Sequence, residues 1–147
     1  MTNDVIVTVK GVQLGMDQSD EIEVINVGKY NEKNGKIYIR YDEQQEGVEG
    51  TVSNMIKIDG KQVEISKKGA IGVQMIFREG EQVNSCYETP YGMLMMGIYT
   101  NEVQCTISEA CIELKLSYSI EMNGEFMSDA NVHIKIEPQG SGMLHLI

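Results

Sequence analysis

Four polar side chains stand where the chain is otherwise apolar, and they are the first candidates for chemistry. Tyr41 and Glu43 lie at alternate positions after an apolar run, and Tyr87 and Tyr118 each share the alternation of the apolar residues around them. A hydroxyl or carboxylate among apolar side chains is costly unless it is hydrogen-bonded or paired with a charge. We expect Tyr87 and Tyr118 to face one interior, with Glu43 close enough to accept hydrogen bonds from their hydroxyls. Two roles are open for such a group: it binds a small molecule by hydrogen bonding, or its polar atoms satisfy one another within a filled core.

A tight turn lies beside one of these tyrosines. The segment Tyr87-Glu88-Thr89-Pro90-Tyr91-Gly92 contains a Thr-Pro-Tyr-Gly turn with proline second and glycine fourth, as a type I turn prefers. Pro90 also keeps Thr89 extended. Two interpretations stay open: a structural corner, or the rim of a cavity where tyrosine hydroxyls gather.

A buried carboxylate such as Glu43 needs a cation as its partner. Lys67 and Lys68, which follow each other in the sequence, are the two candidates for that partner. The predicted ligand-binding residues are Tyr41, Glu43, Lys68, Tyr87, Thr89 and Tyr118.

Catalytic and metal motifs are sparse. His133 and His145 are the only histidines, and neither belongs to an HxH, HExxH or Cys/His pattern. There is no GxSxG elbow and no glycine-rich phosphate loop, and the acidic run 17–21 lacks the central glycine and final glutamate of an EF-hand. We predict no catalytic residues, no metal and no cofactor. An enzyme would have to use a Tyr/Glu/Lys acid–base set that no spacing specifies.

The net charge and the composition limit which classes of partner the protein can bind. The 147 residues include 12 Lys and Arg against 22 Asp and Glu, a formal net charge of −10, with 41% hydrophobic residues. This balance favours a folded protein and disfavours nucleic acids and anionic membrane surfaces, which repel an acidic chain. The length suits one domain, which we expect to span residues 1–147.

The location expected is the cytoplasm. The N-terminus has no basic region followed by an apolar stretch, as a secretory signal would. Cys86, Cys105 and Cys111 are odd in number and form no CxxC pair, which favours free thiols in a reducing compartment.

Short apolar runs separated by glycine turns indicate an all-β chain. Strands are predicted at 36–41, 51–58, 62–66, 70–77 and 112–122, with turns at Asn34-Gly35, Asp59-Gly60, Glu79-Gly80 and Asn123-Gly124. Residues 112–121 alternate strictly between apolar and polar side chains, and 132–137 repeat the pattern. Residues 103–111 could begin a helix with the capping box Thr106-x-x-Glu109, but their alternation favours a strand.

Short hairpin turns connect consecutive predicted strands, and no long crossover connection is predicted. Such a chain can form one of two architectures, a meander barrel or a two-sheet sandwich. We predict an antiparallel meander β-barrel of about eight to ten strands, because closure removes exposed sheet edges. Side chains can fill such a barrel, or it can hold one small ligand.

Five segments together resemble one known family. They are Ile39 to Glu43, Val63 to Gly69, Tyr87 to Gly92, Tyr99-Thr100, and Leu114-x-Leu116-x-Tyr118, in this order along almost the whole chain. They are similar to the YwiB-like domain-of-unknown-function family of Gram-positive bacteria. The resemblance implies a calycin-like, lipocalin-like barrel in a bacterial cytoplasm and supplies no catalytic residues.

Two classes of function follow. The first is a barrel that binds a small apolar or amphipathic molecule, with the tyrosines as polar groups and Met93, Met95 and Met96 as adaptable lining. The alternative is a protein-interaction module or homodimer with a filled barrel. The run from Met93 to Tyr99 supports it, since this run is apolar on both faces and its outward side chains need cover.

Overall fold

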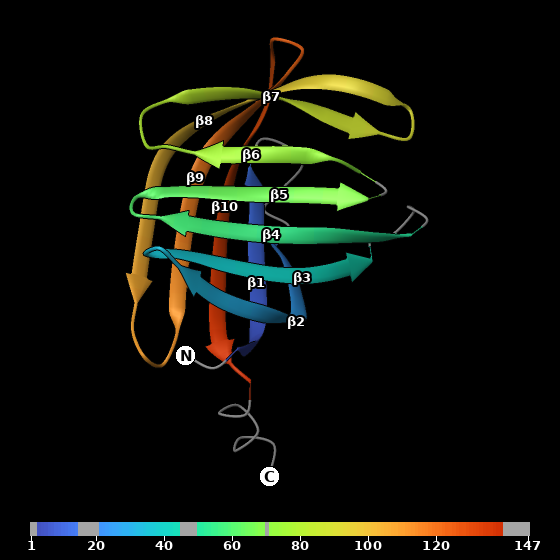
Figure 1. Ribbon diagram of the computed structural model, residues 1–147. Coiled ribbons are helices and arrows are strands. Elements are labelled where there is room, and N and C mark those ends of the chain that lie inside the picture. The colour runs from blue at the N-terminus through green and yellow to red at the C-terminus, as the bar shows by residue number, and fades with distance from the viewer. Residues whose placement is uncertain (1–2, 15–20, 45–49, 70, 140–147) are drawn as a thin grey trace.

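A computed structural model describes residues 3–14, 21–44, 50–69 and 71–139, and ten β-strands take up most of them (Figure 1). The strands are β1 (Asp4–Leu14), β2 (Glu21–Lys33), β3 (Lys36–Gln44), β4 (Thr51–Asp59), β5 (Gln62–Gly69), β6 (Val73–Phe77), β7 (Gln82–Thr89), β8 (Gly92–Ile107), β9 (Ile112–Met122) and β10 (Glu125–Pro138). Among the described residues, no helix is long and apolar enough to span a membrane.

The strands form one antiparallel sheet in the order β6-β5-β4-β3-β2-β1-β10-β9-β8-β7. The first and last strands, β1 and β10, pair along ten residue positions, from Val5 opposite Pro138 to Leu14 opposite Asp129. The outer strands β6 and β7 meet only at a bridge, where Gly72 and Glu88 exchange backbone hydrogen bonds of 2.9 and 2.7 Å. The sheet is therefore a nearly closed barrel, and the predicted antiparallel meander is confirmed.

Two groups of strands cross each other. Figure 1 shows β3 to β6 running across β1, β10, β9 and β8, so the barrel is flattened between them. The sheet turns the corner at Gly28 in β2, which pairs with Val5 on one side and Tyr41 on the other. A Cβ atom at Gly28 would lie 2.8 Å from the Arg40 carbonyl oxygen, so only glycine allows this close approach.

The interior is a single apolar cluster supplied by both groups of strands. Its fully buried members include Val5, Ile39, Ile56, Phe77, Leu114 and Ile134. Along β9 the even-numbered residues from Ile112 to Tyr118 are buried, as the alternation predicts. Apolar side chains therefore fill the middle of the barrel.

Two of the four predicted hairpin turns have the expected geometry. Asn34 and Gly35 both have positive φ, and so do Asn123 and Gly124, as a type I′ turn requires. At the third turn the loop residues are Gly60 and Lys61, one position later than predicted, and only Gly60 has positive φ. The fourth, around Gly80, is not a hairpin, because the segment passes from β6 to β7, which meet only at the bridge.

Two further boundaries differ from the sequence predictions. The strand predicted at 70–77 begins only at Val73, because Gly72 pairs across to Glu88; residue 70 lies outside the described residues. The strand preferred over a helix at 103–111 is confirmed as far as Ile107. Ser108 then closes a turn with Cys111, whose backbone oxygen accepts from the Ser108 amide at 2.9 Å.

Candidate functional site

A polar cluster lies inside one end of the barrel, on β3, β4 and β5. The Lys67 ammonium donates to Glu43 Oε1 and to Asn54 Oδ1, each at 2.7 Å. Asn54 Nδ2 in turn donates to the same Glu43 oxygen at 3.0 Å. Asn54 is only 2% exposed, whereas the Lys67 and Glu43 side chains are 20% and 14% exposed. Solvent therefore reaches the ion pair, and the cluster sits at a mouth of the barrel.

The sheet register places this cluster in a ring of inward-facing side chains. Tyr41 lies opposite Asn54, Asn54 opposite Lys67, and Lys67 opposite Val73. Beyond the open seam, the Gly72–Glu88 bridge sets Tyr87 opposite Val73, and Tyr87 packs against the core. The ring is thus polar on β3 to β5 and apolar on β6 and β7, apart from the Tyr87 hydroxyl.

Tyr41 is the most strongly perturbed titratable group of the ring. It is buried, and burial together with the negative charge of Glu43 raises the pKa of its phenol well above the ordinary value. Tyr41 therefore stays a neutral hydrogen-bond donor at any physiological pH.

Tyr118 faces the same interior as Tyr87, as predicted, but it serves another part of the core. Tyr87 pairs with Leu94 and Tyr118 with Thr100, which share one face of β8. The Tyr118 ring packs edge-on against Phe77, with centroids 4.9 Å apart, and burial raises its pKa to about 12. Within the described residues neither tyrosine hydroxyl bonds to Glu43. The predicted hydroxyl–carboxylate contacts are wrong: Glu43 Oε1 instead accepts hydrogen bonds from Lys67 and Asn54.

Lys68 is not part of the cluster. It is exposed, and it follows the inward-facing Lys67 by one residue on β5, so its side chain leaves the opposite face of the sheet. Of the two lysines considered as partners for Glu43, Lys67 is the one that binds it. The alternation Val63, Ile65, Lys67 carried this information in the sequence.

Thr89 belongs to the structural corner. Its hydroxyl accepts from the Tyr91 amide at 3.1 Å and donates to the Gly92 carbonyl at 2.8 Å, which stabilises the turn. Tyr91 is 97% exposed and lines no interior. The corner interpretation therefore accounts for Thr89 and Tyr91, and of this segment only Tyr87 packs against the core.

Asn54 is the site residue that the sequence prediction missed. It lies between Val52 and Ile56 in the inward phase of β4, and it is the residue through which the Glu43 and Lys67 side chains are linked a second time. An amide at an inward position of an otherwise apolar strand was the available signal.

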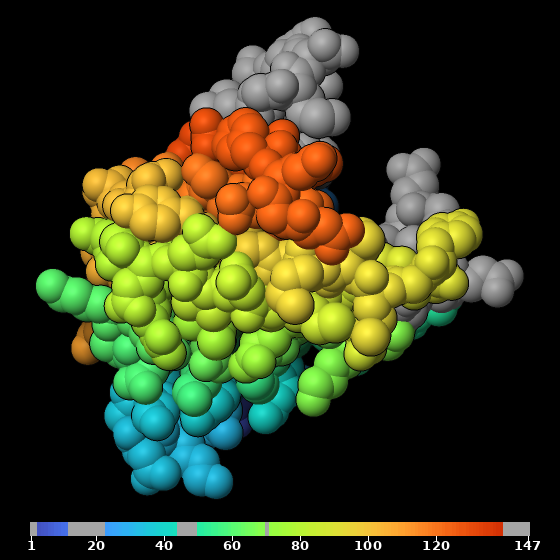
Figure 2. All heavy atoms as spheres, turned by 90° about the horizontal axis from the view of Figure 1, so that it is seen from above, coloured from blue at the N-terminus to red at the C-terminus, as the bar shows by residue number. Residues whose placement is uncertain are grey.

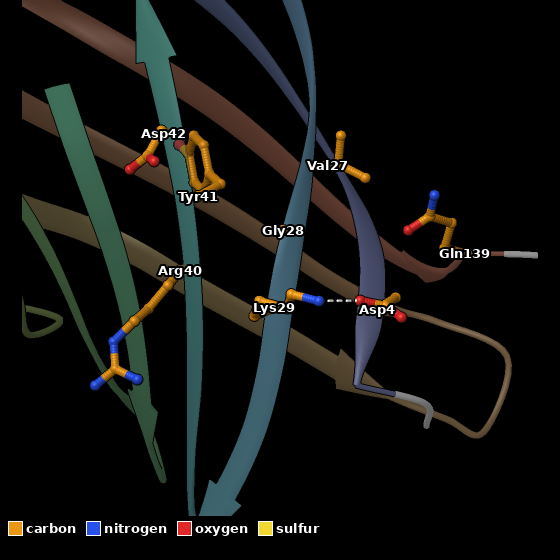
Figure 3. A pocket seen from close by; sticks show the side chains of 8 residues that line it. All are labelled: Asp4, Val27, Gly28, Lys29, Arg40, Tyr41, Asp42 and Gln139. Carbon is orange, nitrogen blue, oxygen red and sulfur yellow. Dashed lines mark hydrogen bonds and ion pairs between the residues drawn. The ribbon is translucent and has the colours of Figure 1, made fainter. Parts of the chain in front are cut away.

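A cavity of about 420 Å³ lies outside the barrel, over the corner at Gly28 (Figure 3). Its charged side chains do not converge. Lys29 is paired with Asp4, while the Arg40 side chain points away from both. This arrangement lacks the few convergent polar groups that fix a ligand.

The described histidine and cysteine side chains belong to no group that could hold a metal ion. His133 is partly exposed on the outer face, and its Nε2 lies 3.5 Å from Glu113 Oε2. His145 lies outside the described residues. Among the described residues no three His, Cys, Asp or Glu side chains gather closely enough to hold a metal ion. Cys86, Cys105 and Cys111 are free thiols.

The sheet order and the packed interior define an antiparallel β-barrel protein. The chain belongs to the family described as "Domain of unknown function (DUF1934)", which matches residues 7–134. It is 24% identical over 117 residues to the "Uncharacterized beta-barrel protein YwiB" of Bacillus subtilis (strain 168), covering 80% of this chain and 81% of that protein. The crystal structure of the ywiB protein superimposes with a TM-score of 0.83 at 23% identity and covers 92% of each chain. The resemblance inferred from the sequence is confirmed, and the shared fold is the barrel.

Proposed function

We propose that the protein is a small-molecule-binding barrel whose ligand is held at the mouth that contains Lys67. The observation that carries this proposal is the Glu43–Asn54–Lys67 cluster inside a barrel whose buried side chains are mostly apolar. Stability does not require such a cluster, because well-packed hydrophobic residues of similar volume often replace a buried ion pair at no cost. Ligand recognition gives these polar groups a role.

The ring of side chains around Lys67 indicates the class of ligand. An ammonium has three N–H donors, and two of those of Lys67 bind Glu43 and Asn54; within the described residues the third has no partner. Because Glu43 already neutralises Lys67, an uncharged acceptor such as a carbonyl oxygen suits this donor better than an anion does. Val73 and Tyr87 provide an apolar wall beside it. The expected ligand is a small amphipathic molecule with a carbonyl or hydroxyl oxygen at one end.

The location proposed for this activity is the cytoplasm. Three free thiols support it, since a reducing compartment keeps cysteines unpaired. The lipocalin-like resemblance also favours a ligand held in the mouth of the barrel.

A fluorescent ketone tests the proposal. Prodan (6-propionyl-2-dimethylaminonaphthalene) is uncharged, has an apolar ring system and one carbonyl acceptor, and shifts its emission to the blue in apolar surroundings. We expect one molecule to bind per barrel with a blue shift. Lys67→Met should weaken binding about 10-fold or more, since a hydrogen bond to a charged group contributes ~1.5–3 kcal/mol. Lys68→Met is the matched control and should bind as the wild type does.

A second variant distinguishes a loss of ligand contacts from a loss of folding. Tyr87→Phe keeps the apolar ring but removes the hydroxyl, which we expect to donate to the second lone pair of the prodan carbonyl, so it should weaken prodan binding and leave the melting temperature nearly unchanged. Absence of a blue shift with the wild type, or equal binding by Lys67→Met and Lys68→Met, would contradict the proposal.

An interaction role is the second candidate, because large apolar side chains are exposed on the β7–β8 hairpin and at the start of β10. Their outward placement is independent of the ligand site inside the barrel.

A further inference from the structure

We propose that the outer surface of the β7–β8 hairpin and the start of β10 docks a basic, amphipathic segment of another protein. The surface, named here the methionine face, consists of five exposed side chains: Tyr91, Met93, Met95, Phe126 and Met127. This inference is independent of the ligand site at Lys67.

The side chains of the methionine face belong to one continuous part of the molecule. The amide of Asn123 donates to the Met95 carbonyl at 2.7 Å, and the Met95 amide donates to Asn123 Oδ1 at 3.0 Å. These bonds fasten the β9–β10 turn to the hairpin, and Phe126 is the second residue after that turn. Figure 2 shows the yellow hairpin reaching out from the body of the barrel beside the orange turn.

The methionine face is too apolar to be an ordinary surface. Met93 is 68% exposed and Phe126 62% exposed. A β-bulge between Phe126 and Ser128 adds Met127, which is also exposed, to the same edge. Contiguous exposed apolar side chains mark interaction sites, and methionine adapts its shape to varied partners. The composition therefore points to a docking surface.

Charge selects the partner. Residues 79–131 hold nine carboxylates and one basic residue, Lys115, so most of the net charge of −10 lies in this third of the chain. Two of these carboxylates stand directly beside the methionine face: Glu88 is the cross-strand partner of Met93, and Glu121 is that of Phe126. An apolar surface with acidic neighbours is complementary to a segment with apolar and basic faces.

The same charge disfavours the other occupants. A second copy would bring the same carboxylates toward each other, and like charges at an interface cost free energy. Anionic membranes and nucleic acids are repelled for the same reason. Of these partners, only a basic amphipathic segment can both cover the methionine side chains with its apolar face and pair its cations with the glutamates.

The test uses a synthetic 18-residue helical peptide built only of leucine and lysine on opposite faces, labelled with fluorescein. Fluorescence anisotropy measures its binding to the full-length chain. We expect saturable binding that weakens as salt is raised, because salt screens exposed charges. The matched peptide with glutamate in place of lysine should not bind.

Two sets of variants locate the binding surface. Met93→Gln, Met95→Gln and Phe126→Gln combined should raise the Kd at least about 10-fold, the usual effect of removing central apolar anchors. The control Ile25→Gln changes an equally exposed apolar side chain on β2 and should leave the Kd unchanged. Glu88→Gln should raise the Kd by about 2- to 5-fold at low salt, as expected for an exposed charge, while the distant Asp42→Asn should not.

Three results would overturn the inference. The first is equal affinity for the lysine and glutamate peptides. The second is equal affinity of the wild type and the triple variant, with circular dichroism showing that both are folded. The third is a wild-type dimer in sedimentation velocity that the triple variant abolishes, since the methionine face would then be occupied by a second copy.

Discussion

Gln82 on β7 and Glu121 on β9 are joined by a hydrogen bond of 2.8 Å that passes over the intervening strand β8. Gly97 on β8 makes the contact geometrically possible. A Cβ atom at this glycine would lie 2.9 Å from Gln82 Nε2 and 2.7 Å from Asn84 Oδ1. Because Gly97 has no side chain, residues of two strands that are not neighbours can form a hydrogen bond across it on the outer face of the barrel.

Gly97 and Gly28 should respond differently to alanine. At Gly97 the added methyl meets the ends of flexible, exposed side chains, so Gly97→Ala should change the free energy of unfolding by less than about 1 kcal/mol. At Gly28 it meets the backbone oxygen of Arg40 at 2.8 Å, so Gly28→Ala should cost about 1–3 kcal/mol through overpacking. Urea unfolding measures both. A larger loss for Gly97→Ala than for Gly28→Ala would contradict the account of the corner.

Removing one partner of the Glu43–Lys67 ion pair should lower the free energy of unfolding more than replacing both partners with apolar residues. Lys67→Met leaves the poorly solvated Glu43 carboxylate without its cation, and we expect a loss of about 2–3 kcal/mol, below the value for a fully buried pair because solvent reaches both side chains. Combining it with Glu43→Leu should recover most of that loss. Urea midpoints of the two single variants and the double variant measure the effect, with Lys68→Met as the silent control. Additive losses would show that the two residues act independently.

Alkaline pH should unfold the protein through its buried tyrosines. The folded-state pKa of Tyr118 is raised to about 12, above its unfolded value near 10, so the unfolded chain loses this proton first. The contribution of Tyr118 is fully present below pH 10 and is lost as the pH rises toward 12; Tyr41 acts in the same direction. We expect absorbance at 295 nm to show late ionisation coupled to unfolding, and Tyr118→Phe to move that transition to higher pH. Ionisation of all tyrosines near pH 10 with the fold intact would contradict this.

The core and surface faces of β9 should differ sharply in sensitivity. Leu116→Ala removes a side chain that is almost fully buried and should cost about 2–5 kcal/mol. Lys115→Ala, one residue earlier on the exposed face, should stay within about 0.5 kcal/mol. Thermal or urea unfolding of both variants checks the pair, and similar losses at both positions would contradict the observed facing of the strand.

Thiol reagents should find three free cysteines of unequal reactivity. Cys86 is exposed and should react first with Ellman's reagent in the folded protein. Burial raises the pKa of the Cys105 thiol, which lowers its thiolate fraction and slows its reaction. Cys86→Ser should remove the fast phase and leave two thiols in the denatured, unreduced protein. A wild-type count of one would mean that two cysteines form a disulfide.

Much of the fold was readable from local patterns. The alternation along residues 112–121 assigns each side chain to a face because successive side chains of a strand point to opposite sides. The asparagine–glycine pairs located two hairpins because few other residues tolerate positive φ at both central positions. The inward direction of Tyr41, Glu43 and Tyr118 followed from the same local rule, and alternation along β5 also distinguishes Lys67 from Lys68.

Only the tertiary structure decided which of these inward groups meet. Alternation assigns a face but not a neighbour, so it could not separate the Tyr118 hydroxyl from the carboxylate of Glu43, nor show that Asn54 lies between Glu43 and Lys67. Those contacts depend on the register of β3, β4 and β5 and on the seam where Gly72 meets Glu88. The bulges in β8 and β10 likewise shift the pairing of distant strands. Local sequence fixes the direction of a side chain, whereas its partners are set by pairings between strands that are far apart in the chain.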